Sequence, residues 1–170
     1  MPLLANDDWR KLFCQAVNRA IPDWSCQRVA FVVRPEHAHL LVLPTSTPVR
    51  IDRLPGSIKR PDSERIKKRL MTENSPLLDS LMVQERPGKV AFRYWQEGPG
   101  DDRNLSTESV VMAAIDDIHW NPVRRGLAER AIDWKWSSAM WYFSDKTIID
   151  PDLPRIDGLP RSFSSDSRTS

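Results

Sequence analysis

The sequence predicts an α+β domain in which helices cover a small sheet. Two features lead to this class: amphipathic segments of helical periodicity alternate with short runs of β-branched and aromatic residues, and two of those runs are joined by a short turn. The chain has 170 residues, the usual size of one domain. Charged residues make up 28% of the chain and hydrophobic residues 40%, which excludes a disordered chain and a membrane channel.

The first third of the chain is expected to contain a helix and a β-hairpin. Apolar residues recur at helical spacing in residues 7–20, where two aspartates open the segment and a proline follows its end. Residues 27–34 and 39–44 are apolar, β-prone runs separated by a short turn. These two runs are therefore predicted to pair as neighbouring strands.

The middle of the chain is expected to contain a loop, a helix and a third strand. Residues 44–57 include three prolines and a glycine, which predict a loop. Residues 61–72 are predicted to form a helix with Pro61 in its first turn, acidic residues near its start and basic residues near its end. A strand is expected within residues 82–96, followed by a polar loop.

The last long helix is expected to begin after an N-cap at Ser106 and to end at Trp120. Asn121 and Pro122 follow, and a proline there predicts the end of the helix. Residues 123–143 contain three tryptophans, which predicts that this segment packs back onto the domain.

The domain is therefore predicted to span residues 1–143, and residues 144–170 are expected to be a loose tail because serine, aspartate and proline are frequent in them. No apolar run approaches the roughly 20 residues of a membrane helix, so no contact with a membrane is expected. The first residues do not resemble a signal peptide, and Cys14 and Cys26 form no Cys-x-x-Cys pair. A cytoplasmic location is expected.

His37 and His39 form the sharpest local motif. Alternate residues of a strand point to the same face, so the two imidazoles are expected to project side by side. Two such nitrogens suit one divalent cation. The other interpretation is a pair of surface histidines at the start of a strand, because an isolated His-x-His is short and arises easily by accident.

A second polar pair lies near the end of the last long helix. Asp117 and Asn121 are four residues apart and share a helix face with the small residue Ala113, which leaves room for a ligand or a metal ion. An ordinary solvated face before an Asn-Pro helix stop is the alternative. His119 lies on another side of the helix and is expected to be packed or to cap the helix.

Basic residues are concentrated in the middle of the chain, where they can follow a phosphate backbone; a charged, solvated helix face is the alternative. The candidate DNA-binding residues are Lys59, Arg60, Arg65, Lys67, Lys68, Arg69, Arg103, Arg124 and Arg125.

Three blocks of the sequence, in the same order, resemble one family. The run FVVRPEHAHLLV is similar to the block VVMPNHVHLLV of IS200-like transposases, and FRYWQEGPGDDRN is similar to their FWQxGxGYDRN block. The run DIHWNPVRRGLAERAIDWKWSSAMWY resembles the block that closes their domain. Within this family the pattern resembles that of the REP-associated tyrosine transposases, over about residues 2–143.

The resemblance implies a ferredoxin-like HUH nuclease fold, with helices packed on an antiparallel sheet. It implies that His37, His39 and Asn121 hold Mg²⁺ or Mn²⁺, and that the substrate is single-stranded or hairpin DNA. The family activity is metal-dependent DNA strand cleavage and transfer for transposition, in which a tyrosine forms a 5′-phosphotyrosine link. Relatives occur as monomers and as dimers, so a homodimer is a further expectation.

The sequence departs from the family in two places. The position of the nucleophilic tyrosine holds Asp117, and an aspartyl phosphate is prone to hydrolysis. The sequence begins near the end of the stretch that holds the first strand of the family, so either the start is wrongly placed or the protein is a decayed copy. Loss of this strand is expected to leave backbone groups of neighbouring strands unpaired.

Four hypotheses follow from this comparison. The first is a transposase homologue that binds hairpin DNA but has lost cleavage, with Asp117 as an additional oxygen ligand. The second is a nuclease that uses metal-bound water. The third is a catalytically inactive DNA-binding module or a regulator of repetitive palindromic DNA, and the fourth is a nonfunctional remnant.

Overall fold

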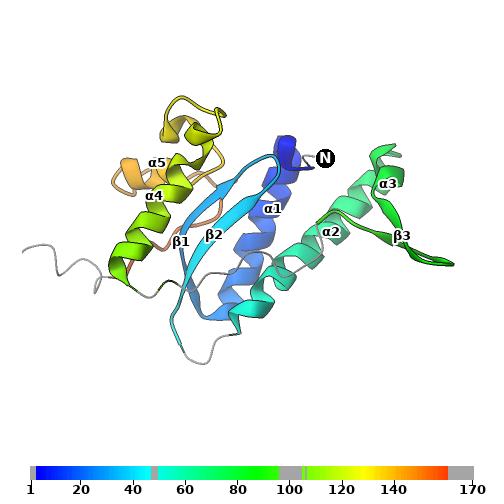
Figure 1. Ribbon diagram of the computed structural model, residues 1–170, viewed down its shortest axis with the longest axis horizontal. Helices are drawn as coiled ribbons and strands as arrows, with labels where there is room; N and C mark the ends of the chain where they lie inside the picture. Colours follow the sequence, from blue (N-terminus) through cyan, green and yellow to red (C-terminus); the bar gives the residue numbers. More distant parts are fainter. Residues whose placement is uncertain (1–2, 47–49, 96–104, 106, 161–170) are drawn as a thin grey trace, which may run out of the picture.

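The computed structural model describes residues 3–46, 50–95, 105 and 107–160, and this part of the chain has a mixed α+β structure. It contains five α-helices and two separate two-stranded antiparallel sheets. Helices α1 (Asp7–Ala20) and α2 (Leu54–Thr72) lie on one side of the main hairpin, and α4 (Glu108–Arg124) lies on the other (Figure 1). The α+β class is confirmed, but the described residues do not form a ferredoxin-like sheet.

The main hairpin consists of β1 (Cys26–Val33) and β2 (Ala38–Pro44), as the two apolar runs joined by a short turn predicted. Its two faces bury different clusters. Phe31 and Leu40 lie opposite each other and pack with the core of α1 and α2, whereas Ala30 and Leu41 pack against Val111 of α4. Residues of β2 therefore face α1 and α4 alternately.

Segments far away in the sequence cover the second edge of β1. The Val33 amide donates to the carbonyl of Trp136 at 2.8 Å, the Ser138 amide donates to Phe31 at 3.0 Å, and the Asp157 amide donates to Arg28 at 2.9 Å. Backbone groups along this edge thus find partners without a third strand. No strand pairs with the other edge of β2 in the described part of the chain.

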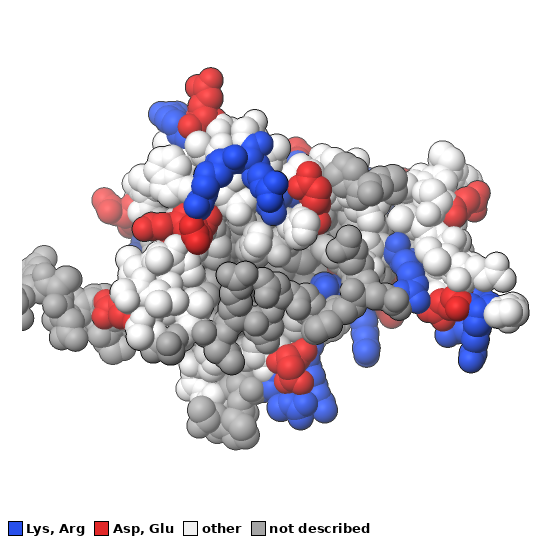
Figure 2. Space-filling view, in the orientation of Figure 1, with Lys and Arg blue, Asp and Glu red and all other residues white. Residues whose placement is uncertain are grey.

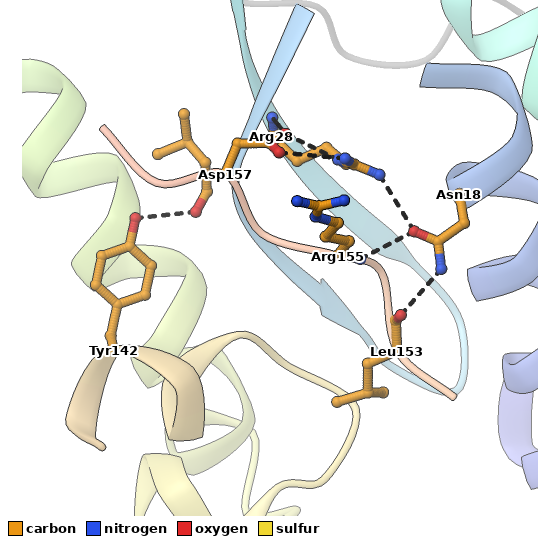
Figure 3. A network of polar contacts seen from close by, with 7 residues as sticks. Asn18, Arg28, Tyr142, Leu153, Arg155 and Asp157 are labelled. Carbon is orange, nitrogen blue, oxygen red and sulfur yellow. Dashed lines mark hydrogen bonds and ion pairs between the residues drawn. The ribbon is translucent and has the colours of Figure 1, made fainter. Parts of the chain in front are cut away.

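The segment that ends at Gly158 is fastened to β1 by a polar network (Figure 3). The Arg28 guanidinium donates to both carboxylate oxygens of Asp157, at 2.9 and 3.2 Å. Asn18 of α1 donates to the carbonyl of Leu153 at 3.0 Å, and the Tyr142 hydroxyl donates to the carbonyl of Val29 at 2.9 Å. The expectation of a loose tail is therefore wrong for this stretch, while residues 161–170 lie outside the described residues.

Helix α1 has the predicted bounds, but α2 begins at Leu54 rather than at residue 61. Pro55 occupies the first turn, where the missing amide hydrogen costs nothing, and Pro61 lies in the helix interior. The loop predicted over residues 44–57 is therefore shorter than expected, because its last four residues belong to α2. The buried side of α2 carries one charged residue, Asp62, among its apolar contacts with α1.

A small second sheet follows α3 (Leu77–Ser80). It pairs β3 (Met82–Arg86) with β4 (Lys89–Phe92), so the stretch expected to hold one strand forms a hairpin. Gly88 lies in the turn with φ of +77°, a conformation that glycine adopts readily.

Helix α4 continues through Pro122 and ends at Arg124, so the expected stop at Trp120 is wrong. Gly126 has φ of +67°, and the Leu127 amide donates to the carbonyl of Pro122 at 2.9 Å, which closes the helix beyond the proline. Thr107 caps the start of α4, and Ser106 lies outside the described residues.

The segment after α4 packs back as predicted, because Trp136 is buried in the core of α1 and α2. It also contains α5 (Ala139–Phe143). Short 3₁₀ turns occupy Leu3–Ala5, Ile21–Trp24, Ile51–Arg53 and Ala131–Asp133. Among the residues with described positions, none of the helices is both long and apolar enough to cross a bilayer.

Candidate functional site at the end of helix α4

The two histidines lie where the main hairpin turns. His37 directly precedes β2, and its carbonyl accepts a hydrogen bond from the Arg34 amide at 2.7 Å. His39 is opposite Val32 in the register, two residues before Leu41, which packs in the α4 cluster. Strand alternation therefore places both histidines on the α4 side of the hairpin, and both are exposed to solvent.

Asn121 contributes an oxygen from the last turns of α4. Its Oδ1 is buried and has no hydrogen-bond partner among the described residues. An enclosed amide oxygen without a donor is suited to a cation, and Mg²⁺ and Mn²⁺ accept oxygen ligands. The side-chain chemistry of His37, His39 and Asn121 thus fits the metal that the family resemblance implies. No group of three or more His, Cys, Asp and Glu residues suited to a metal occurs in the described part of the chain.

Asp117 forms an ion pair with Arg124 of the same helix. Both terminal nitrogens of Arg124 donate to its Oδ1 at 2.9 Å, and one of them also donates to its main-chain carbonyl at 3.0 Å. The pair spans two turns of α4, beside the exposed indole of Trp120. The carboxylate is therefore directed to Arg124, and Arg124 is partly neutralised as a candidate DNA-binding residue.

His119 is a packed residue, as the sequence predicted. It is buried, its Nε2 lies 2.9 Å from the Ser138 hydroxyl, and its ring lies 5.0 Å from the ring of Tyr142. Burial lowers the pKa of His119 to about 4, although the charge of Asp116 acts in the opposite direction. The imidazole therefore stays neutral at physiological pH and supports the junction of α4 and α5.

The basic residues of α2 lie on the opposite side of the hairpin from α4 (Figure 1). Lys59 and Lys67 lie 6.0 Å from the ring centroids of Trp95 and Phe92, respectively, and Arg69 pairs with Asp8 at 2.6 Å. In the view of Figure 2, positive and negative side chains alternate over the surface without a large area of one sign. The structure does not bring the basic residues of α2 to the histidines, and Arg103 lies outside the described residues.

Arg34 was missed by the sequence analysis. It lies opposite His37 at the hairpin turn, on the α4 side, and only 5% of its surface is exposed. Burial lowers its pKa from the ordinary value, and the positive charge of Arg125, at the end of α4, lowers it further. The available signal was the alternation of the hairpin, which places residue 34 on the same face as residues 37 and 39.

Comparisons with models of protein families, with curated proteins and with solved structures gave no match. The family resemblance therefore depends on the three sequence blocks, and the site on the geometry described above.

Proposed function

We propose that the protein is an IS200-like transposase homologue that binds single-stranded or hairpin DNA beside the end of α4 and has lost tyrosine-dependent cleavage. The observation that carries this proposal is the buried Oδ1 of Asn121, which has no partner among the described residues. It lies on α4, the helix that packs against the face of the hairpin on which strand alternation places His37 and His39. Those three residues match the metal-binding positions of the family blocks. The exposed indole of Trp120 and the cation of Arg125 can contact a DNA base and a phosphate, respectively.

His37, His39 and Asn121 are the residues that would hold Mg²⁺ or Mn²⁺. When bound, the ion neutralises charge on the phosphoryl oxygens of the DNA. Asp117 cannot act as the tyrosine does, because its carboxylate is anionic and is held by Arg124. The DNA is therefore bound without formation of a covalent link.

The test restores the missing nucleophile. Wild-type protein and the variants Asp117→Tyr and Asp117→Tyr/His37→Ala are incubated with a fluorescent hairpin oligonucleotide and Mn²⁺, and binding and denaturing gels are compared. We expect wild type to bind without an adduct. Asp117→Tyr should form an adduct as its phenol oxygen bonds to phosphorus and a DNA 3′-hydroxyl leaves, and the double variant should not.

Three outcomes contradict the proposal. An adduct with the wild-type protein means that cleavage is retained, and an absence of binding excludes the DNA substrate. If Asp117→Tyr binds the hairpin but forms no adduct, the metal-binding residues no longer support the family reaction. The alternative function, a regulator of repetitive palindromic DNA, predicts binding that is unaffected by EDTA and by His37→Ala.

Release of Arg124 should tighten DNA binding. Asp117→Ala removes a negative charge and frees the guanidinium that it holds, and we expect an increase in affinity of about threefold to tenfold at low salt. Asp116→Ala is the matched control, because this exposed neighbour has no ion pair with another described residue. Equal effects of the two substitutions in fluorescence anisotropy titrations show that only net charge matters and that the pair has no role.

A further inference from the structure

Arg34 differs from the other buried arginines of the described part of the chain. Arg10 donates to Asp7, and Arg28 donates to Asp157. Among the described residues, no carboxylate lies within 4 Å of Arg34 and its guanidinium makes no hydrogen bond. Its Nε is buried and has no partner in this part of the chain. A guanidinium keeps its charge in proteins, so this enclosure costs free energy that an anion would offset.

The charges around Arg34 do not supply that anion. Glu36 is close enough to act on it electrostatically but forms no ion pair with it, and Arg125 adds a second positive charge. Unlike Arg124, Arg125 forms no ion pair with a described residue. Arg34 at the hairpin turn is thus a buried guanidinium on which the charge of Arg125 acts, and neither group has a carboxylate partner among the described residues.

We propose that Arg34 and Arg125 form a binding site for a phosphoryl anion that operates without a metal ion. The forked guanidinium group matches the geometry of phosphate oxygens and donates two parallel hydrogen bonds. A backbone phosphate of DNA and free inorganic phosphate share this chemistry. Only binding of a DNA phosphate depends on the proposed function. In that case Arg34 contacts the DNA backbone and positions the DNA strand beside His37.

The first experiment uses inorganic phosphate. Thermal unfolding of wild type, Arg34→Met and Arg125→Met is followed in sodium phosphate and in sodium chloride of equal ionic strength. Phosphate should raise the midpoint of the wild type by about 2–4 °C and should leave both variants within about 1 °C of their chloride values. In chloride, Arg34→Met should be at least as stable as wild type, because methionine fills a similar space without a buried charge.

The second experiment uses single-stranded and hairpin oligonucleotides in EDTA. Arg34→Met should weaken binding about tenfold and reduce the slope of log affinity against log salt by about 0.7, the effect of losing one phosphate contact. Arg86→Met is the matched control: it removes the same charge at the end of β3, which lies beyond α2 and far from α4 (Figure 1). This control should bind DNA within about twofold of wild type.

The two experiments separate the sources of phosphate. A response to inorganic phosphate with unchanged DNA binding in Arg34→Met assigns the site to free phosphate. If the wild-type protein binds no DNA, the proposed function is wrong. The thermal unfolding experiment with inorganic phosphate still tests whether Arg34 and Arg125 bind an anion. The inference is overturned if Arg34→Met equals wild type in both experiments, or if Arg34→Met and Arg125→Met keep the phosphate response.

Discussion

Replacing Asp62 with asparagine is expected to stabilise the protein by about 2–4 kcal/mol at about pH 8. Asp62 is completely buried between α2 and α1. Its Oδ2 accepts one hydrogen bond, from the Trp95 indole at 3.2 Å, and its Oδ1 has no partner among the described residues. Burial raises the pKa of this carboxyl to about 7, although the bond from Trp95 lowers it.

The sign of the effect follows from proton binding. Between about pH 4 and pH 7 the unfolded chain loses the Asp62 proton while the folded protein keeps it, so the contribution of this group to stability falls as the pH rises. His119 acts in the opposite direction, because its pKa is lowered to about 4 in the folded protein and its contribution rises with pH up to about 6.5. The comparison of Asp62→Asn with wild type isolates the first effect.

Urea unfolding at a series of pH values checks this prediction. The difference in free energy of unfolding between Asp62→Asn and wild type should be small at about pH 4 and should grow to its full value above about pH 7. Asp79→Asn, at an exposed carboxyl of α3, should show no such growth. A constant difference over this range would show that Asp62 does not retain its proton on folding.

Removal of the Asp157 carboxylate is expected to destabilise the protein by about 2–4 kcal/mol. Arg28 is 10% exposed at its side chain and Asp157 is 26% exposed, so Asp157→Ala leaves a largely buried guanidinium without a counter-charge. The carboxylate also accepts the Arg28 amide at 2.9 Å. Burial alone would raise the pKa of Asp157, but the hydrogen bonds and the charge of Arg28 hold it below its usual value.

Asp52→Ala is the control for this prediction. Its ion pair with Arg50 has the same 2.9 Å separation, but the two side chains are 58% and 60% exposed, and solvent screens such pairs so that they contribute little to stability. Chemical denaturation of the two variants therefore compares a largely buried ion pair with an exposed one at the same separation. Equal losses of stability would contradict the role assigned to Asp157 in fastening the C-terminal segment.

Local sequence pattern was sufficient for α1, whose apolar residues recur at helical spacing, and for the main hairpin, whose two apolar runs flank a short turn. The errors in the predicted helix boundaries came from the interpretation of prolines. Pro61 and Pro122 were interpreted as helix boundaries, but each is tolerated inside a helix, and the actual boundaries are set by Pro55 and by Gly126. A proline shows where an amide hydrogen is missing and does not show whether neighbouring turns compensate for it.

The site was predicted only as far as local spacing reaches. The shared face of His37 and His39 follows from strand alternation, but the pairing of Asp117 with Arg124 depends on a helix that continues past Pro122. The burial of Arg34 depends on the packing around the hairpin turn, which no local pattern encodes. Tertiary packing therefore decides which of the polar residues are available to a ligand.

The fastening of β1 by residues near position 157 has a consequence for synthesis on the ribosome. The hydrogen bonds of Arg28 and Asn18 reach partners more than a hundred residues later in the chain. Contacts of such long sequence separation form late, since the intervening chain must first be made and closed. The nascent chain thus stays incompletely folded until the segment around Asp157 has emerged, and translation arrest before Asp157 should yield a species that proteases degrade readily.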